Sequence, residues 1–241
     1  MSELSIYTFD RLKITVMKKL VLIFITLLFS VSMFAQEDVT KFLGIPVDGF
    51  KPEMVRSLKA KGFVQHPYNA DILTGEFNGR EVNVGVVTNN NKVYRIFLQD
   101  KYTVSETDIK IRFNTLCSQF KNNKKYISIG DQSIPEDEDI SYEIGVKNKR
   151  YEATFFQTPE KIDTLGMQAQ LLEALKVLYT EEELANPTEE MQTKMLELKM
   201  LYTYKLIDSK QVWFMIDQVG SNYRILMYYD NKRNQANGED L

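Results

Sequence analysis

Cysteine, histidine and tryptophan are scarce in this sequence, and their scarcity excludes several classes of site. The 241 residues include one cysteine, Cys117, one histidine, His66, and one tryptophan. A single cysteine excludes an intrachain disulfide and any zinc module built from several cysteines. A single histidine excludes sites that need two imidazoles. Stability must therefore come from a hydrophobic core, and a chain of this length with 44% hydrophobic residues can build one.

A large excess of charge of one sign is also absent. The chain carries 30 Lys+Arg against 33 Asp+Glu, for a formal net charge of −3. Residues 1–35 hold four basic and two acidic residues, so the chain without them has a net charge of −5. Nucleic acids require a basic stripe, and anionic lipid attracts basic segments. We therefore expect no nucleic-acid partner.

The longest apolar run is short for a membrane span. Met17, Lys18 and Lys19 precede the mainly apolar residues 20–31, and Ala35 and Gln36 follow soon after. A basic start, a short apolar run and a small exit residue are typical of a secretory signal peptide. A spanning helix needs about 20 apolar residues, so a retained anchor is the less favoured alternative.

These features predict a signal peptide over residues 17–35, cleaved between Ala35 and Gln36, and export to the periplasm or outside the outer membrane. After cleavage we expect no stable membrane span. Residues 1–16 do not fit the pattern, because they include Glu3 and Asp10 where a signal peptide is basic. We interpret residues 1–16 as an upstream extension that results from a mis-assigned start, with translation starting at Met17.

Hydrophobic periodicity divides the rest of the chain into helices and strands. Helical spacing of apolar residues predicts four helices, over residues 51–61, 106–122, 165–179 and 188–206. Alternation and strand-like composition predict seven strands, over residues 81–88, 93–99, 126–129, 139–146, 150–157, 211–218 and 223–229. The pattern indicates an α+β protein in which helices pack on one face of an antiparallel sheet.

Two blocks of this pattern superpose without a gap at an offset of 58 residues. Leu58 then corresponds to Leu116, and strand 81–88 corresponds to strand 139–146. Residues 97–99, Phe-Leu-Gln, correspond to residues 155–157, Phe-Phe-Gln. We therefore predict tandem helix-plus-antiparallel-sheet units. A chance alignment of two similar folds is the alternative.

The expected organisation follows from this repeat. A first α+β unit occupies residues 36–104 and a second occupies residues 105–158. A helical hairpin and a final β-hairpin occupy residues 159–229, and a tail occupies residues 230–241. The Tyr-Arg-Ile of residues 223–225 in the final hairpin also repeats the Tyr-Arg-Ile of residues 94–96.

The candidate catalytic groups have ordinary structural explanations. Cys117 lies in the apolar stripe of its helix, where a buried thiol packs as a small hydrophobe, and His66 lies in a predicted loop. Glu143, Glu152 and Asp217 fall on or beside predicted strands. Glycoside hydrolysis needs two carboxylates at a defined separation, which the sequence does not show. No phosphate-binding glycine loop or nucleophile elbow is present.

Two segments are rich in oxygen ligands. The acidic loop 135–139 lacks the spaced acidic residues and central glycine of an EF-hand loop, so we interpret it as a solvated turn. The tail 230–241 is interpreted as an ordered turn that lets Leu241 pack on the sheet edge, with a frayed terminus or a cation or partner site as alternatives. We expect no catalytic residue, no metal and no cofactor.

Several segments resemble exported proteins of Gram-negative gut anaerobes. They are residues 17–19, 34–36, 42–49 and 237–241. The resemblance implies export and supplies no activity. In such organisms a short Asp-Thr/Ser-apolar motif can receive an O-linked glycan, and residues 163–165, Asp-Thr-Leu, match it. Thr164 is therefore a candidate O-glycosylation site.

The duplicated units also look, more loosely, like the β-lactamase-inhibitor-protein fold and its relatives among outer-membrane assembly lipoproteins. That resemblance implies a binding module rather than an enzyme. This chain departs from both groups, because it lacks a lipobox cysteine after the apolar run and the paired cysteines of the inhibitor. Similarity of topology alone does not determine function.

We therefore expect an exported, non-enzymatic binding module that recognises a protein or peptide in the cell envelope. An uncovered antiparallel face, edge or hairpin tip can accept a partner. The expected contact residues are Asn89, Asn90, Asn91, Lys147, Asn148, Lys149 and Arg150. One alternative is a small-ligand or glycan-binding protein whose pocket uses exposed members of Tyr142, Tyr151, Tyr223 and Tyr229. A hydrolase with two carboxylates is a further alternative.

Overall fold

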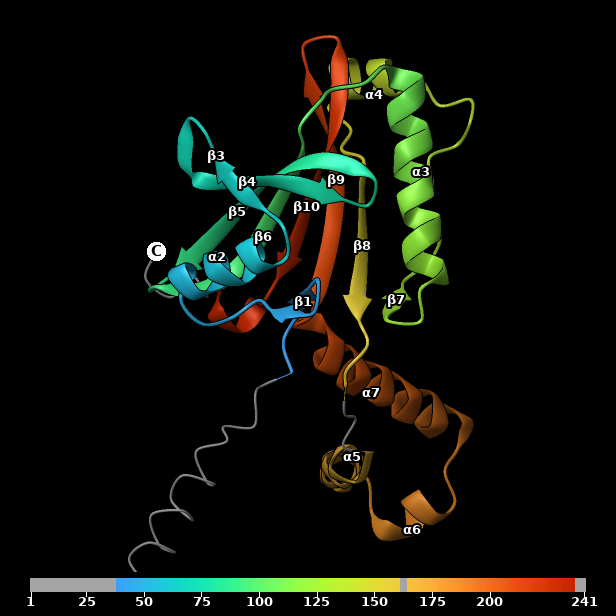
Figure 1. Ribbon diagram of the computed structural model, residues 1–241. Coiled ribbons are helices and arrows are strands. Elements are labelled where there is room, and N and C mark those ends of the chain that lie inside the picture. Colours follow the sequence, from blue (N-terminus) through green and yellow to red (C-terminus); the bar gives the residue numbers. More distant parts are fainter. Residues whose placement is uncertain (1–37, 161–163, 237–241) are drawn as a thin grey trace, which may run out of the picture. The chain divides into compact units, whose positions relative to one another are not determined.

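Eight antiparallel strands form one sheet, which organises the structure (Figure 1). The structure is a computed structural model that describes residues 38–160 and 164–236. The strand order is β3-β4-β5-β6-β10-β9-β8-β7. The strands are Val64–His66 (β3), Asn69–Phe77 (β4), Arg80–Asn89 (β5), Lys92–Asp100 (β6), Tyr126–Ser128 (β7), Glu152–Gln157 (β8), Gln211–Val219 (β9) and Asn222–Asp230 (β10). A separate two-stranded ribbon pairs Lys41–Phe42 (β1) with Ile45–Pro46 (β2).

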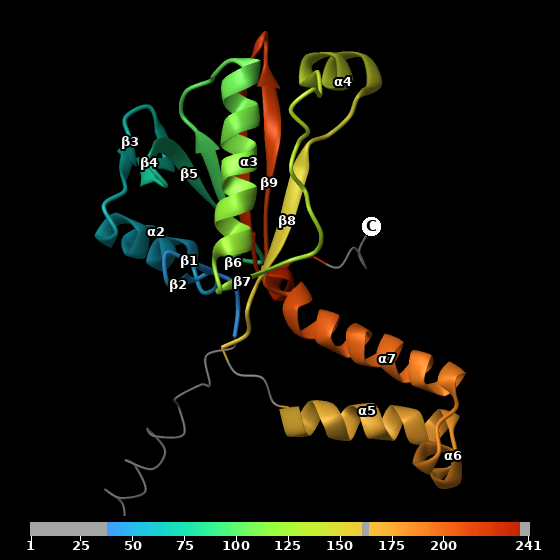
Figure 2. The same ribbon diagram turned by 90° about the vertical axis from the view of Figure 1, so that its right-hand side faces the viewer.

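Two helices cover the same face of this sheet (Figure 2). One precedes β3 to β6 in the chain, and the other precedes β7 to β10. They are Lys51–Ala60 (α2) and Glu106–Asn122 (α3). The hydroxyl of Ser105 accepts a hydrogen bond from the backbone N–H of Asp108 at 3.2 Å and caps the start of α3. The remaining helical segments are Ile140–Lys147 (α4), Thr164–Leu178 (α5), Glu181–Ala185 (α6), Glu189–Asp208 (α7) and the short 3₁₀ turn Lys232–Asn234 (η1).

The chain is built from tandem units, as the sequence predicts, and each unit is a helix followed by a four-stranded meander. Helix α2 precedes β3 to β6, and α3 precedes β7 to β10. The last strands of the two meanders, β6 and β10, pair with each other at the centre of the sheet, and the first strands, β3 and β7, form its two edges. Helix α4 is inserted between β7 and β8, and helices α5 to α7 are inserted between β8 and β9. The final β-hairpin thus completes the second meander, which continues past residue 158.

The alignment at an offset of 58 residues holds for the helices and is wrong for the strands. Leu58 in α2 and Leu116 in α3 are both buried, as the alignment requires. Phe97 and Phe155 also correspond, yet Phe155 belongs to the core while Phe97 lies on the opposite face of the sheet. The better internal match is the repeated Tyr-Arg-Ile, because residues 94–96 lie in β6 and residues 223–225 lie in β10, the two equivalent central strands.

The predicted strand over residues 139–146 is also wrong, because this segment forms helix α4. The carboxylate of Asp139 accepts a hydrogen bond from the backbone N–H of Tyr142 at 2.8 Å and caps the helix. Glu143 and Lys147 form an ion pair at 2.6 Å with helical spacing. Asn148 ends the helix with a φ of 53°. The apolar residues alternate, but Ile140 and Ile144 also lie four residues apart, so the sequence pattern fits both structures.

The core lies between the sheet and helices α2 and α3. The rings of Phe120, Phe155 and Phe214 stack with centroids 4.8–6.0 Å apart, and Phe113 packs edge-on against Phe214 at 5.0 Å. These side chains come from α3, β8 and β9, and they fix α3 on the second meander. The core therefore positions the strands whose opposite face carries the candidate site.

One buried ion pair connects the two units on the helix side. The guanidinium of Arg112 in α3 donates two hydrogen bonds, of 2.6 and 2.7 Å, to the carboxylate of Asp100 at the end of β6. Both side chains are only 9% exposed. A bidentate pair of this kind satisfies both charges, and removal of one partner leaves the other buried and unpaired.

We therefore predict that Asp100→Ala lowers the free energy of unfolding by about 3–5 kcal/mol, because the Arg112 guanidinium is left without its carboxylate. Urea unfolding followed by circular dichroism measures this loss. Glu81→Ala is the control, since Glu81 pairs with Lys101 at the surface and its removal leaves no buried charge. Equal effects of the two substitutions would contradict the prediction.

Candidate functional site

The face of the sheet opposite α2 and α3, here called the open face, carries a row of aromatic side chains. Residues that are paired across antiparallel strands point to the same side of the sheet. One such row crosses six strands, and its members are Ile72, Gly85, Phe97, Tyr228, Trp213 and Thr154. The next row consists of Thr74, Asn83, Gln99, Leu226, Met215 and Glu152.

Three rings in the middle of the open face form a continuous stack. The rings of Trp213 and Tyr228 lie 4.1 Å apart at an interplanar angle of 17°, and Phe97 lies 5.3 Å from Tyr228. All three side chains are partly exposed. They therefore present apolar and aromatic surface to solvent while they remain ordered by contact with one another.

An arginine–carboxylate pair holds one side of this stack. The Arg95 guanidinium donates to Asp230 at 2.6 and 2.8 Å, and the indole N–H of Trp213 donates to the same carboxylate at 2.9 Å. The guanidinium also lies 4.8 Å from the ring centre of Tyr228. The hydrogen bond to Asp230 raises the pKa of Arg95 above its ordinary value. The aromatic and charged groups thus hold each other in one arrangement.

The other arginines of the open face are paired as well. Arg224 donates to Asp217 at 2.7 Å, and Arg150 lies 3.2 Å from the Glu152 carboxylate. The amide oxygen of Gln99, in its favourable orientation, also accepts from Arg224 at 2.9 Å. Each of these arginine charges is balanced by a carboxylate, so the face carries little net charge.

One polar atom on the open face has no partner within the described parts of the chain. The side-chain oxygen of Asn83, in the row next to the aromatic stack, is buried and accepts no hydrogen bond there. A buried acceptor that lacks a donor costs free energy.

Helix α7 borders the open face. The ring of Tyr204 in α7 packs edge-on against the ring of Phe156 in β8, with centroids 5.9 Å apart. Phe156 is paired with Gln211 and lies outside the main core, on the open side of β8. Helix α7 extends from this corner on the side of the sheet away from α2 (Figure 2). Leu196, Met200 and Tyr204 lie four residues apart along α7 and are 58%, 65% and 43% exposed, so an apolar stripe continues outward from the sheet.

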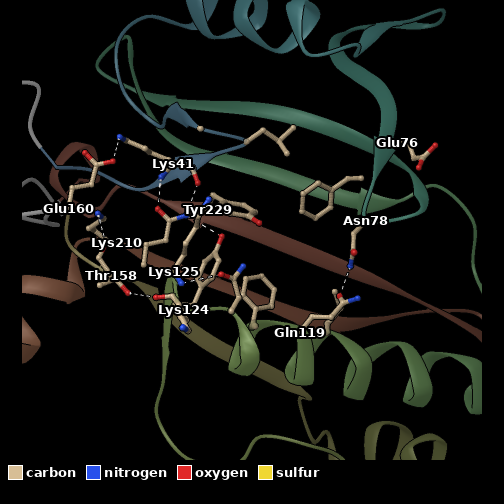
Figure 3. A pocket seen from close by; sticks show the side chains of 18 residues that line it. Lys41, Glu76, Asn78, Gln119, Lys124, Lys125, Thr158, Glu160, Lys210 and Tyr229 are labelled. Carbon is tan, nitrogen blue, oxygen red and sulfur yellow. Dashed lines mark hydrogen bonds and ion pairs between the residues drawn. The ribbon is translucent and has the colours of Figure 1, made fainter.

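A pocket of about 1000 Å³ lies on the helix side of the sheet, between the two units (Figure 3). Apolar side chains line it, namely Leu43, Phe77, Leu116, Phe120, Tyr126 and Tyr229. Burial raises the pKa of Tyr229 well above its ordinary value. Four lysines also line the pocket, Lys41, Lys124, Lys125 and Lys210, and they gather at the end away from Asn78 and Gln119 (Figure 3).

The hairpin residues expected to contact a partner lie in two separate places. Asn90 and Asn91 are exposed at the tip of the β5–β6 hairpin with φ values of 47° and 64°, while the Asn89 amide donates to the Asn234 carbonyl at 3.1 Å. The segment 147–150 is exposed between α4 and β8. The strand register places these two segments at opposite ends of the sheet. Arg150 is the member nearest the open-face rows described above, because it contacts Glu152.

The other sequence candidates are dispersed. Cys117 is buried in α3, and His66 ends β3. Glu143 lies in helix α4 and not on a strand, and it pairs with Lys147. Glu152 and Asp217 each pair with an arginine of the open face. Of the four tyrosines proposed for a pocket, Tyr151, Tyr223 and Tyr229 are buried and Tyr142 is 50% exposed, and Tyr229 lines the pocket described above.

Both oxygen-rich segments form ordered turns where they are described. In the acidic loop, the Lys110 ammonium donates to the Glu136 carbonyl at 2.8 Å. In the tail, the Asn231 amide donates to the Val47 carbonyl at 2.9 Å, and the Asn234 amide donates to the Asp48 carboxylate at 2.7 Å. These bonds hold Asn231 and Asn234 against the segment 47–48. The predicted packing of Leu241 lies outside the described residues.

Several predictions concern residues that the structure does not describe. They are the extension 1–16, the signal peptide 17–35 and its cleavage between Ala35 and Gln36. Thr164 is the first residue of α5, but its side chain and its neighbour Asp163 lie outside the described parts. These expectations stay predictions.

The aromatic stack of the open face was missed by the sequence reasoning. Strands β9 and β10 carry large apolar residues at both odd and even positions, for example Trp213 and Phe214, and Tyr228 and Tyr229. Such a strand is apolar on both faces although only one face is covered by α2 and α3. These apolar residues at successive positions were the sequence feature that could have indicated an exposed aromatic face, but a strand buried on both sides shows the same pattern.

Comparison with known proteins identifies no relative of this chain, so its function is inferred from the geometry of the site. No family model, curated protein or solved structure matches the chain. Among the described residues, no cluster of three or more acidic, histidine or cysteine side chains is suited to hold a metal ion. No helix in the same parts of the chain has the length and apolar character needed to cross a membrane.

The environment of Cys117 yields a prediction about its reactivity. Burial, followed by the charge of Asp131, raises the pKa of the thiol to about 12 from a reference of 9.0. At pH 8 the native protein then holds about a thousandfold less thiolate than an unperturbed cysteine, and the thiolate is the reactive form. We predict negligible alkylation by iodoacetamide at pH 8 and complete alkylation in urea, measured by intact mass. Rapid alkylation of the native protein would show an accessible, ionisable thiol instead.

Proposed function

We propose that the protein is a non-enzymatic binding module that recognises a partner protein through its open face. The observation that carries this proposal is the stack of Phe97, Tyr228 and Trp213, held by the Arg95–Asp230 pair. Tryptophan, tyrosine and arginine dominate the residues that contribute most to binding at protein interfaces. A stack ordered before binding loses little conformational entropy when a partner docks.

The charges of the open face favour a protein over a polyanion. Arg95, Arg224 and Arg150 are all balanced by carboxylates, so these arginines do not form an unpaired basic stripe for phosphate groups. The centre of a protein interface is depleted in unbalanced charge and enriched in aromatic residues and arginine, and this is the composition observed. The exposed stripe of α7 extends the apolar surface beyond the sheet.

The edges of the sheet are poorly suited to strand addition. The edge strands β3 and β7 are three residues long. The side chain of Gln65 in β3 also folds back to donate to the backbone carbonyls of Ala70 and Ile72 at 2.8 and 2.9 Å. Short edge strands discourage pairing with another chain. We therefore infer docking on the face rather than at an edge.

The proposal includes the location of the partner. The basic and apolar pattern of residues 17–35 is that of a signal peptide, so we propose that the protein is exported and that its partner is a protein or peptide of the cell envelope. Attachment of a glycan at Thr164, at the start of α5, is a separate part of the proposal.

The partner test uses residues 36–241 as bait against detergent-solubilised envelope from the protein's own host. A photo-crosslinking residue replaces Gln99 on the open face, or Tyr68 in a matched control. Tyr68 is 93% exposed in the β3–β4 turn and belongs to neither of the two open-face rows. We expect one protein to crosslink from position 99 and not from position 68. Equal crosslinking from both positions, or from neither, would reject the open face as the binding surface.

Affinity measurements with the recovered protein sharpen the test. Phe97→Ala and Leu226→Lys are each expected to weaken binding at least about tenfold, because they alter the centre of the face, whereas Tyr68→Ala leaves affinity unchanged. Trp213 is the only tryptophan in the chain, so its emission reports directly on the face. Thermal unfolding verifies that each variant is folded. Unchanged affinity in both folded face variants contradicts the proposal.

A further inference from the structure

The pocket between the two units has a charge opposite to that of the whole chain. The chain has a formal net charge of −3, yet among the described residues four lysines and two carboxylates, Glu76 and Glu160, line this pocket. The lysines come from three segments far apart in the sequence: β1, the link between α3 and β7, and the residue before β9. Their convergence at one end of a cavity creates a local positive potential.

Two of these lysines are well ordered by the fold. Lys210 is only 2% exposed, and its ammonium donates to the Thr158 carbonyl at 3.3 Å. Lysine is rarely buried to this extent, because the loss of hydration of its charge is costly. Lys41 forms an ion pair with Glu160. Lys124 and Lys125 are exposed at the rim. The pocket thus has a cationic end with both buried and exposed charges.

Apolar side chains of both units form walls of the pocket, and the polar side chains of Asn78, Gln119, Asn123 and Gln157 also line it. The ring of Tyr126 packs edge-on against Phe120 at 4.7 Å, and that of Phe77 packs edge-on against Tyr229 at 6.4 Å. The Asn78 amide in the β4–β5 turn donates to the side-chain oxygen of Gln119 in α3 at 2.8 Å and joins the two units at the far end. The pocket therefore has lysines at one end, aromatic walls, and the uncharged Asn78–Gln119 amide pair at the other end.

We propose that this pocket binds a small amphipathic anion, a carboxylate carried on an aliphatic or aromatic body. The carboxylate lies at the lysine end, and the body lies against Phe77 and Phe120. Known ligand pockets are about 300–1,000 Å³ and combine apolar walls with convergent polar groups. This pocket has a volume of about 1000 Å³, aromatic walls and four lysines at one end. Its cationic groups in the described parts of the chain are lysines and not arginines, so recognition is by point charges rather than by a bidentate fork. A bound ligand contacts both units and stabilises the fold by linkage.

Three probes separate the charge from the apolar body. Octanoate supplies both, 1-octanol supplies only the body, and inorganic phosphate supplies only charge. Isothermal titration of residues 36–241 at low ionic strength is expected to show one octanoate per chain, bound at least about tenfold more tightly than 1-octanol or phosphate. Octanoate also raises the melting temperature. Equal affinity for octanoate and 1-octanol, or no saturable octanoate site, overturns the proposal.

Matched lysine variants locate the site. The double substitution Lys124→Gln with Lys125→Gln is expected to weaken octanoate binding about tenfold, since each exposed charge contributes up to about fivefold. The control is Lys147→Gln with Lys149→Gln, which removes two exposed lysines outside the pocket and leaves affinity unchanged. Equal effects of the two double variants contradict the assignment.

The emission of Trp213 distinguishes this site from the open face. Trp213 lies on the face of the sheet opposite to α3, whereas the pocket lies on the side of α3. Octanoate in the pocket leaves Trp213 emission unchanged, and octanoate on the open face changes it and rejects the pocket. The lysine variants do not alter the open face, so the result of the partner test and the result of this test are independent.

Discussion

The pairing of β6 with β10 is the interaction on which the rest of the structure depends. It joins two four-stranded meanders into one sheet and places Phe97 beside Tyr228 and Arg95 beside Asp230. Both contacts of the open face therefore cross the boundary between units. On the helix side, the Arg112–Asp100 pair and the walls of the pocket cross the same boundary. Neither unit alone contains either surface, so both depend on correct register between these two strands.

The sequence predicted the long elements well because their patterns are unambiguous. Helix α3 begins and ends at the predicted residues. Ser105 caps its first turn, and Ile109, Phe113 and Leu116 repeat at helical spacing along it. Helix α4 was predicted as a strand because Ile140 and Ile144 satisfy both periodicities, and only tertiary context decides between them. Tandem units were predicted, but the offset of 58 residues was misleading because the insertions interrupt only the second meander.

The candidate sites were less predictable, since they are made by contacts between distant residues. Sequence reasoning correctly placed Cys117 in the core. It did not identify Trp213 or Arg95, because a half-exposed aromatic residue on a strand has the same sequence pattern as a buried one. The lysines of the pocket are separated by up to 169 positions and show no motif. Only the fold brings them together.

The insertions in the second meander also have a consequence for how the chain folds. The first meander, β3 to β6, contains only local pairings and is complete at Asp100, whereas the Arg95–Asp230 contact joins positions 135 residues apart. Loop-closure entropy rises only slowly with length, but distant pairings form late and slow folding. Until β10 arrives, the nine-residue strand β6 is an unprotected edge. Before β10 pairs with it, this long edge can mispair with other chains.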